Sequence, residues 1–186
     1  MGTLTITGGT LRSRRVPTPP GRAVRPTPSR VKEALFSILG SRVERARVLD
    51  LFAGSGALGF EALSRGAAEV TFVERHRSTA DALRSVARTL GVDGQVAIIS
   101  ADVQHAPGRL DGRYDLVFAD PPYAQAYPAA LFAALRESHT IDAATTVVYE
   151  HAARSASPSD PAMRLERAER YGEVALAFLR PVAGAA

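Results

Sequence analysis

From residue 47 onward the chain alternates between short apolar runs and longer amphipathic segments, and this alternation restricts the fold more than any other feature of the sequence. A short apolar run predicts a strand buried on both faces, and an amphipathic segment predicts a helix. Strands that alternate with helices form a parallel sheet with helices on both faces, because each return to the same edge needs a crossover. We expect strands at residues 48–52, 70–74, 96–100, 116–119 and 145–150, and helices at residues 57–65, 78–90 and 129–137.

The last part of the chain departs from this pattern. Two strand-like runs, residues 164–170 and 174–179, flank a short turn at Tyr171-Gly172 and predict an antiparallel hairpin. Together with the parallel strands, this hairpin predicts an α/β fold of the Rossmann-like kind with a mostly parallel sheet of seven strands.

The first part of the chain also differs. Residues 3–6 alternate as a strand does, Gly8-Gly9 is typical of a hairpin turn, and residues 10–16 continue the pattern, so we expect a small β-ribbon. A proline-rich connector follows, and then a helix that Thr27 is placed to cap and Gly40 to end.

Positive charge is concentrated in this first part. Residues 1–47 hold ten Arg or Lys and two Glu, whereas the rest of the chain holds thirteen basic and seventeen acidic residues. Such asymmetry is typical of a basic arm that contacts nucleic acid. We therefore divide the chain into a basic ribbon and arm at residues 1–27 and a main domain at residues 28–186. The candidate nucleic-acid contacts are Arg12, Arg14, Arg15, Arg25 and Arg30.

Composition narrows the classes of protein that remain. At 186 residues with 46% apolar and 23% charged residues, the chain fits one soluble globular domain with a small appendage. It has no cysteine, which excludes disulfides and thiolate metal sites. Its four histidines show no ligand spacing, so no metal is expected. No apolar run is long enough to span a membrane and no signal segment opens the chain, so we expect a cytoplasmic protein.

A glycine-rich loop joins the first strand of the alternating region to the helix that follows. Gly54, Gly56 and Gly59 form the G-x-G-x-x-G pattern in that context, where glycines let a ligand approach the backbone closely. Glu74 ends the next strand, twenty residues after Gly54, where a carboxylate can bind both hydroxyls of a ribose. Asp102 follows the third strand and suits an adenine amino group. A cofactor that contains a nucleoside is therefore predicted.

The charge beside this loop distinguishes two kinds of cofactor. A dinucleotide such as NAD places its pyrophosphate at the helix N-terminus, which an extra carboxylate would oppose. Asp50 ends the first strand, and an acid there suits the ammonium group of S-adenosylmethionine, which has no phosphate. This favours S-adenosylmethionine and leaves NAD as the alternative. The candidate cofactor contacts are Asp50, Phe52, Ala53, Gly54, Ser55, Gly56, Glu74, Arg75, Asp102, Val103 and Asp120.

A second motif ends the fourth strand. The apolar run at residues 116–119 stops at Asp120-Pro121-Pro122-Tyr123. Prolines cannot donate to a sheet ladder, and they hold the preceding residue extended, so this corner is stiff and its carbonyl groups are open. Ligands of open α/β sheets bind outside the carboxyl ends of the strands. A carboxylate, free carbonyls and an aromatic ring are suited to hold a flat polar group there.

These motifs resemble those of class I methyltransferases that act on amino groups, and the fuller pattern is similar to bacterial small-subunit (16S) ribosomal RNA guanine-N2 methyltransferases. The glycine loop and the Pro-Pro-Tyr corner are common to the whole superfamily, whereas the amino-terminal pieces are specific. Lys32 departs from the pattern, where Arg is expected. The matching pieces are Ile6-x-Gly8-Gly9, Arg25-Pro26-Thr27, Arg30-Val31-x-Glu33-x-Leu35-Phe36, the segment from Leu51 to Ala67, Phe118 to Tyr123, and Tyr171-Gly172.

The resemblance implies a Rossmann-like class I methyltransferase fold and transfer of a methyl group from S-adenosylmethionine to the exocyclic N2 of a guanine in 16S ribosomal RNA. Asp120 and the Pro121 carbonyl would accept the two N–H groups of the target amine, and Tyr123 would stack on the base. Asp120, Pro121, Pro122 and Tyr123 are therefore the candidate catalytic residues. The expected partner is 16S ribosomal RNA or the small ribosomal subunit, with no membrane, no metal and a monomeric protein.

Three other functions fit parts of the sequence. A DNA or RNA adenine-N6 methyltransferase would carry the same Asp-Pro-Pro-Tyr corner, although 186 residues leave little room for a DNA-recognition segment. An NAD-dependent dehydrogenase would explain the glycine loop and Glu74 but gives no role to Asp50. A non-catalytic RNA-binding module would explain the basic arm alone.

Overall fold

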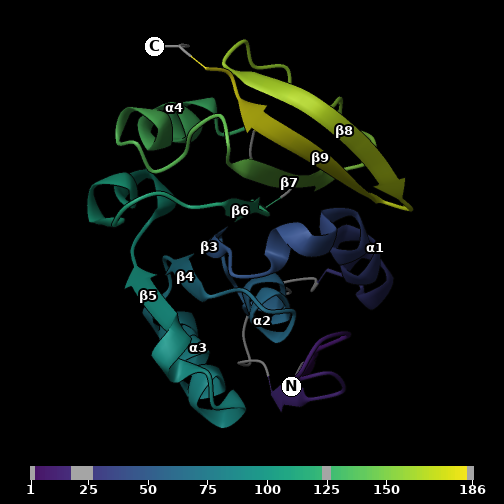
Figure 1. Cartoon of the computed structure of the whole chain (residues 1–186), viewed down its shortest axis with the longest axis vertical. Helices are drawn as coiled ribbons and strands as arrows, with labels where there is room; N and C mark the ends of the chain where they lie inside the picture. The colour runs from purple at the N-terminus through teal and green to yellow at the C-terminus, as the bar shows by residue number, and fades with distance from the viewer. Residues whose placement is uncertain (1–2, 18–26, 123–126, 184–186) are drawn as a thin grey trace.

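The computed structural model describes residues 3–17, 27–122 and 127–183. Its main sheet has seven strands in the order β5-β4-β3-β6-β7-β9-β8 (Figure 1). Neighbours from β5 to β7 are parallel, and the pairs β7–β9 and β9–β8 are antiparallel, which confirms the predicted mostly parallel sheet and its closing hairpin. The strands are β3 (Arg47–Leu51), β4 (Glu69–Glu74), β5 (Val96–Ser100), β6 (Leu116–Ala119), β7 (Thr146–Ala152), β8 (Met163–Tyr171) and β9 (Val174–Pro181).

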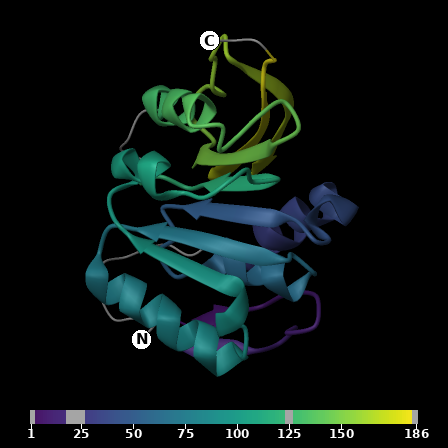
Figure 2. The same ribbon diagram turned by 60° about the vertical axis from the view of Figure 1, so that its left-hand side comes forward.

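Helices cover both faces of this sheet (Figure 2). One apolar core lies between the sheet and α1, α2 and α3, and a second lies between the sheet and α4. Alternate residues of β6 enter different cores, Phe118 the first and Val117 the second, which is why the whole strand is apolar. The helices are α1 (Ser29–Leu39), α2 (Ala57–Ser64), α3 (Arg77–Leu90) and α4 (Ala129–Glu137), with short 3-10 turns η1 (Gly40–Val43), η2 (Asp93–Gln95), η3 (Val103–His105) and η4 (Pro107–Arg109).

The order of the strands determines where a ligand can bind. The chain begins the sheet at β3, adds β4 and β5 on one side, and then crosses to add β6 and β7 on the other. The two halves meet between β3 and β6, where Leu51 is the register partner of Ala119. The chain leaves β3 toward β4 on one side and leaves β6 toward β7 on the other, which opens a crevice at the carboxyl ends of β3 and β6. The glycine loop follows β3 and the Asp-Pro-Pro corner follows β6, so both motifs lie at this crevice.

The amino-terminal ribbon is shorter than predicted. β1 (Thr3–Thr5) pairs with β2 (Arg15–Pro17), but residues 10–13 are turn and Arg14 lies outside both strands. They leave the strand path because they dock on the end of α2, where the N–H of Thr10 donates to the Ser64 carbonyl at 2.7 Å. Gly9 has a φ of +76°, and a Cβ there would overlap the Ser64 carbonyl. The Gly8-Gly9 pair therefore permits close docking on α2 and not a two-residue hairpin.

Helix α1 ends where the sequence predicts but begins differently. Gly40 follows its last residue and donates its N–H to the Phe36 carbonyl. The prediction that Thr27 caps the helix is wrong, since the helix begins at Ser29 after Pro28 and has no side-chain cap. The Thr27 hydroxyl instead donates to a carboxylate oxygen of Glu150 at 3.2 Å, which ties the start of α1 to the end of β7.

Candidate active site

Four carboxylates lie at the carboxyl ends of four adjacent strands. Asp50, Glu74 and Glu150 belong to β3, β4 and β7 and are buried, and the half-buried Asp120 follows β6. Asp50 and Asp120 alternate with neighbours that enter the second core, so both side chains point to the face covered by α1 and α2. The strand ends thus gather negative charge on one side of the crevice.

The glycine loop has an unusual backbone. Phe52, Gly54 and Gly56 all have positive φ, at 60°, 53° and 74°. This conformation is strained for Phe52, and such strain is typical of residues that form a binding site. A Cβ on Gly56 would overlap the Phe60 ring, and one on Gly59 would overlap the Phe72 ring. The glycines therefore let the loop turn sharply and let α2 pack directly on β4.

Carboxylates accept the backbone N–H groups of this loop. One oxygen of Glu74 accepts the N–H of Gly54 at 3.0 Å, and the other accepts the N–H of His76 at 2.8 Å. Asp50 accepts the N–H of Gly59 at 3.0 Å. Amides that could bind a phosphate at this helix N-terminus are thus already bonded to the carboxyl groups of Glu74 and Asp50. This arrangement is suited to a cation or a hydroxyl pair and not to a pyrophosphate.

Burial raises the pKa of two of these acids, Asp50 and Asp120. Burial raises the pKa of Asp50 to about 8, the Gly59 N–H opposes that rise, and the charge of Glu74 adds to it. Burial also raises the pKa of Asp120 well above its ordinary value, and the nearby Glu150 and Asp50 carboxylates raise it further. Desolvation and like charges both disfavour the ionised forms. A cationic ligand in the crevice would reverse this effect.

The remaining predicted cofactor residues lie around the same loop or further along the same edge. Ala53 is buried and Ser55 is half-buried, both within the loop. Arg75 is exposed, beside His76. Asp102 is exposed at the end of β5, where its carboxylate accepts the Gln104 N–H at 3.1 Å. Val103 is half-buried against the second core. The structure thus brings together Asp50, residues 52–56, Glu74 and Asp120, and it places Asp102 and Val103 one strand beyond Glu74.

The corner after β6 opens on a small pocket. Pro121 is buried and Pro122 is exposed, whereas Tyr123 lies outside the described residues. Both prolines line a pocket of about 140 Å³ whose other walls include Tyr149 and His151 of β7. The rings of Tyr149 and His151 are stacked, with centroids 5.6 Å apart.

The β7 residues Tyr149, Glu150 and His151 had no predicted role. The signal for Glu150 was available, because it is an acid at the carboxyl end of a predicted parallel strand, as Glu74 is. Nothing in the sequence distinguishes His151 from the other three histidines, yet His151 is buried and the others are exposed.

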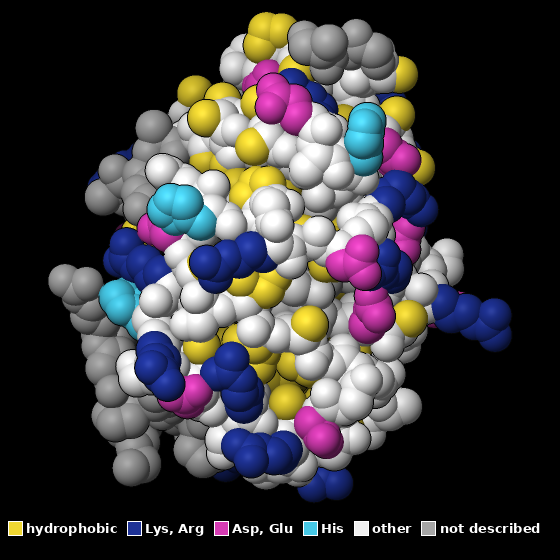
Figure 3. Space-filling view, turned by 90° about the vertical axis from the view of Figure 1, so that its left-hand side faces the viewer, with side chains coloured by type: hydrophobic (Ala, Val, Ile, Leu, Met, Phe, Trp, Pro, Cys, Tyr) yellow, Lys and Arg dark blue, Asp and Glu magenta, His cyan; other side chains and the backbone are white. Residues whose placement is uncertain are grey.

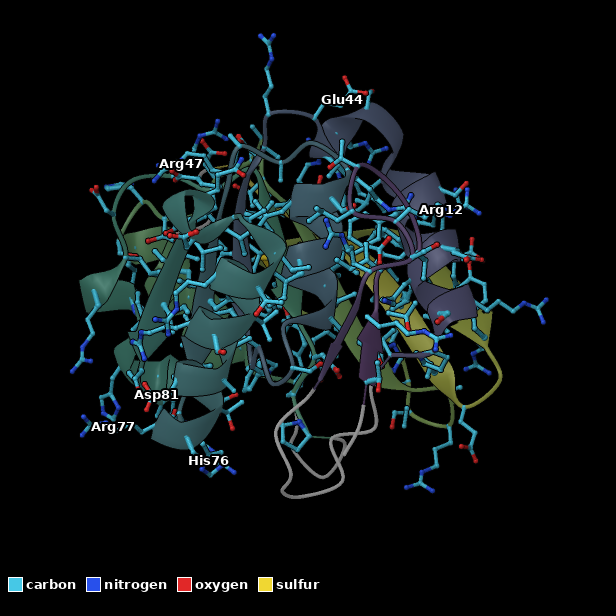
Figure 4. The ribbon with its side chains drawn as sticks, turned by 90° about the horizontal axis from the view of Figure 1, so that it is seen from below. Arg12, Glu44, Arg47, His76, Arg77 and Asp81 are labelled. Carbon is cyan, nitrogen blue, oxygen red and sulfur yellow. The ribbon has the colours of Figure 1, made fainter. Side chains whose placement is uncertain are left out.

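The described residues among the predicted RNA contacts lie on the ribbon and at the start of α1, which the Thr27–Glu150 hydrogen bond ties to the end of β7. Arg12, Arg14 and Arg15 are exposed on the ribbon, Arg30 is exposed in the first turn of α1, and Arg25 lies outside the described residues. Figure 4 shows Arg12 on a different side of the molecule from His76 and Arg77 at the start of α3. On the α3 side, basic and acidic side chains are interspersed (Figure 3), and Arg84 pairs with Asp81 at 2.8 Å.

A buried ionic cluster attaches the ribbon to the main domain. Glu61 of α2 accepts the N–H of Thr7 at 2.9 Å and binds the Lys32 ammonium at 3.2 Å and Arg65 at 2.9 Å. Lys32 also donates to the Thr5 carbonyl at 2.6 Å. Lys32 is buried, so its departure from the expected Arg affects this cluster and not a contact with phosphate.

Two features are absent from the described ranges. No helix there is both long and apolar enough to cross a membrane. Within the same ranges no group of three or more His, Asp or Glu side chains is arranged to hold a metal ion.

Comparison with solved structures identifies the fold. An RNA methyltransferase from Salinibacter ruber, solved with S-adenosyl-L-homocysteine, has a TM-score of 0.64 at 19% identity, over 84% of this chain and 94% of that chain. A structure from Thermus thermophilus, described as a hypothetical protein, has a TM-score of 0.77 at 33% identity, over 96% of this chain and 99% of that chain. The protein has the Rossmann-like fold of class I methyltransferases.

Sequence comparison then identifies the family. Residues 4–180 match the model of the family described as conserved hypothetical protein 95. Ribosomal RNA small subunit methyltransferase D of Escherichia coli K12 is 33% identical over 175 residues, which are 94% of this chain and 88% of the relative. The chain belongs to this family, which confirms the resemblance to small-subunit ribosomal RNA methyltransferases.

Proposed function

We propose that the protein transfers a methyl group from S-adenosylmethionine to the exocyclic N2 of a guanine in 16S ribosomal RNA. The observation that carries this proposal is the group of buried carboxyl side chains around the glycine loop. Glu74 and Asp50 accept loop N–H groups, and the pKa of Asp50 and that of Asp120 are both raised. A cofactor with an ammonium and a sulfonium, and without phosphate, stabilises the ionised form of these groups, whereas the phosphates of NAD would oppose it.

The cofactor would lie along the carboxyl ends of β3, β4 and β5. Asp50 faces its ammonium group, Glu74 has lone pairs left for the ribose hydroxyls, and Asp102 reaches the adenine amino group. The cofactor supplies a methyl group bonded to a positively charged sulfur. The walls would be formed by Phe52, Ala53, Gly54, Ser55, Gly56, Arg75 and Val103.

Residues of the corner after β6 would hold the methyl acceptor. The exocyclic amine of a base is a poor nucleophile because its lone pair is delocalised into the ring. Asp120 and the Pro121 carbonyl would accept its two N–H groups and turn its lone pair toward the methyl group. Pro122 keeps the corner stiff, and Tyr123 would stack on the base. Alignment of the reacting atoms and acceptors placed where positive charge develops would then supply most of the rate. As the nitrogen–carbon bond formed, the carbon–sulfur bond of the cofactor would break, S-adenosylhomocysteine would leave, and the amine would lose one proton to the Asp120 carboxylate.

RNA would be bound mainly outside this crevice. The ribbon within residues 1–27 carries the exposed Arg12, Arg14 and Arg15, and Arg30 is exposed at the start of the proposed catalytic domain at residues 28–186. Arg25, outside the described residues, is proposed as a further RNA contact. The relative in Escherichia coli is named for a small-subunit ribosomal RNA activity, which supports the same substrate here. A base cannot reach Asp120 while it is stacked in a helix, so the target must be unpaired or flipped out.

Nucleoside analysis tests this proposal directly. Purified protein, S-adenosylmethionine and unmodified small subunits or 16S ribosomal RNA should yield N2-methylguanosine. Asp120→Ala should lower kcat by at least about 100- to 1000-fold, because an acceptor for developing charge is lost. The exposed acid Asp111 gives the matched control, Asp111→Ala, which should keep full activity. N6-methyladenosine as the product would establish the adenine alternative, and thermal stabilisation by NAD but not by S-adenosylhomocysteine would contradict the cofactor assignment.

A further inference from the structure

The buried histidine of β7 has one ring nitrogen that the chain does not satisfy. His151 is only 7% exposed, and its Nδ1 lies 3.1 Å from the carbonyl oxygen of Ala152. Its Nε2 is buried and has no hydrogen-bond partner among the residues that the structure describes. Buried polar atoms are nearly always paired, so an unpaired one beside a pocket indicates a ligand group.

The partner of Nδ1 fixes what Nε2 can do. A carbonyl oxygen only accepts, so Nδ1 carries the hydrogen and the Nε2 of the neutral ring is an acceptor. Burial lowers the pKa of His151, and the charge of Arg170 lowers it further, although the Ala152 carbonyl opposes the change. The neutral ring is therefore favoured at physiological pH, with a lone pair at the buried position.

The pocket around this ring has the character of a base-binding site. His151 lines it together with Pro121 and Pro122 of the proposed acceptor corner. Its aromatic walls are Tyr149, stacked on His151, and Tyr127, whose ring centroid is 5.3 Å from that of Tyr149. Asp120 directly precedes Pro121 of this pocket, and its charge contributes to the raised pKa of Tyr149. Flat aromatic surfaces with one buried acceptor suit the edge of a nucleobase.

We propose that His151 determines the base specificity of the site by accepting the N1–H of the target guanine at Nε2. This inference rests on the proposed function, and it adds a residue that reads the ring beside the reacting amine. In guanine, N1–H is adjacent to the 2-amino group, so a base whose amine is held by Asp120 and Pro121 presents N1–H to the same pocket. In adenine, the ring nitrogen adjacent to the amine carries a lone pair, which Nε2 would repel.

Packing alone is the competing explanation for a buried histidine stacked on a tyrosine. In that case substitution would change stability and overall rate but would not change the choice of base. The discriminating measurement is therefore a ratio between two substrates and not an activity.

2-Aminopurine provides that ratio, because it keeps the 2-amino group and replaces N1–H by a lone pair. RNA fragments with guanine or 2-aminopurine at the methylated position are compared by kcat/KM. Wild-type protein should prefer guanine by roughly 10- to 100-fold, as expected when a buried acceptor loses its donor. His151→Phe keeps a ring against Tyr149 without an acceptor and should reduce the preference to less than about threefold. His151→Gln restores an acceptor and should recover part of the preference.

His139→Asn is the matched control, because His139 is exposed and lies outside the pocket; it should keep the wild-type ratio. An unchanged ratio in folded His151→Phe protein would overturn the role of His151. If that variant does not fold, a wild-type ratio near one would overturn it equally. Wild-type protein that forms no N2-methylguanosine at all would instead refute the proposed function, and this inference with it.

Discussion

Two buried carboxylates next to helix α2 have opposite environments. Glu61, on the helix, is fully buried and is bonded to the Lys32 ammonium, the Arg65 guanidinium and the Thr7 N–H. Asp50, at the end of β3, is 4% exposed and accepts one N–H, that of Gly59. Among the described residues Asp50 forms no ion pair, and its charged neighbours are acids.

The protonation of the two groups follows from these environments. Burial alone would raise the pKa of Glu61, but its hydrogen bonds to Thr7 and Arg65 and the charge of Lys32 lower it below its ordinary value. The pKa of Asp50 is instead raised to about 8. The chain itself neutralises the Glu61 carboxylate, so the Glu61 cluster is a structural contact that needs no ligand. Within the part of the chain that the structure describes, the second carboxylate has no counter-charge, which is the property expected of a binding site.

The largest expected loss of stability follows substitution in the Glu61 cluster. Glu61→Gln leaves the buried Lys32 ammonium without its anion, and breaking a buried pair in this way costs about 3–5 kcal/mol of unfolding free energy. Chemical denaturation at pH 7 measures this loss. Glu69→Gln is the matched control, because the Glu69–Arg47 pair is about half exposed and should contribute no more than about 1 kcal/mol.

Lowering the pH should cause part of the same loss of unfolding free energy in the wild-type protein. Because the pKa of Glu61 is lowered by folding, its contribution is complete above its ordinary pKa of 4.5 and is lost as the pH falls below that value. Equal destabilisation by Glu61→Gln and Glu69→Gln would show that the two kinds of pair do not differ, and the contrast with Asp50 would lose its basis.

Substitution of Asp50, at the proposed ligand site, should have a smaller effect and should increase stability. Folding raises the pKa of Asp50 from 3.8 to about 8, so between these values the folded state binds more protons and stability falls as the pH rises. Asp50→Asn removes that charge and can keep the bond from Gly59, so it should flatten this slope and raise Tm at pH 8 by roughly 3–10 °C. Thermal melting of cofactor-free protein from pH 5 to 9 measures both changes.

The same substitution should weaken cofactor binding. If Asp50 binds the ammonium group as proposed, loss of this acceptor should lower the affinity for S-adenosylhomocysteine by roughly 10- to 100-fold in calorimetry. Asp111→Asn, at an exposed position, should change neither stability nor affinity. A lower Tm at pH 8 for Asp50→Asn would mean that the folded protein already stabilises this charge.

The contrast between the two clusters also explains what the sequence could predict. The sheet, its helices and the carboxylates at the strand ends follow from local periodicity and from the rule that ligands bind at those ends. Lys32 and Glu61 are 29 residues apart and join through a tertiary contact, which no local pattern encodes. The docking of residues 10–14 on α2 was missed for the same reason, since Gly8-Gly9 carries an equally strong local signal for a hairpin.

The smallest effect on stability is expected at the ribbon that the Glu61 cluster holds in place. Arg12, Arg14 and Arg15 are exposed, so replacing all three by Ala should leave Tm and cofactor affinity nearly unchanged. RNA affinity should fall and become less dependent on salt, because binding releases fewer counterions when phosphate contacts are lost. If each arginine contacts one phosphate, the slope of log affinity against log salt should decrease by up to about three.

A second triple variant makes this test specific. Arg77, Arg84 and Arg88 are exposed on α3, and Figure 4 shows Arg77, at the start of this helix, on the opposite side of the view from Arg12 of the ribbon. Their replacement by Ala removes the same charge, so a long-range effect of net charge would alter the salt slope equally in both variants. If the ribbon binds phosphate directly, the salt slope should change mainly in the variant that lacks Arg12, Arg14 and Arg15. A larger loss of slope in the α3 variant would place the RNA on the α3 side, and the Glu61 cluster would then hold the ribbon for a purpose other than RNA binding.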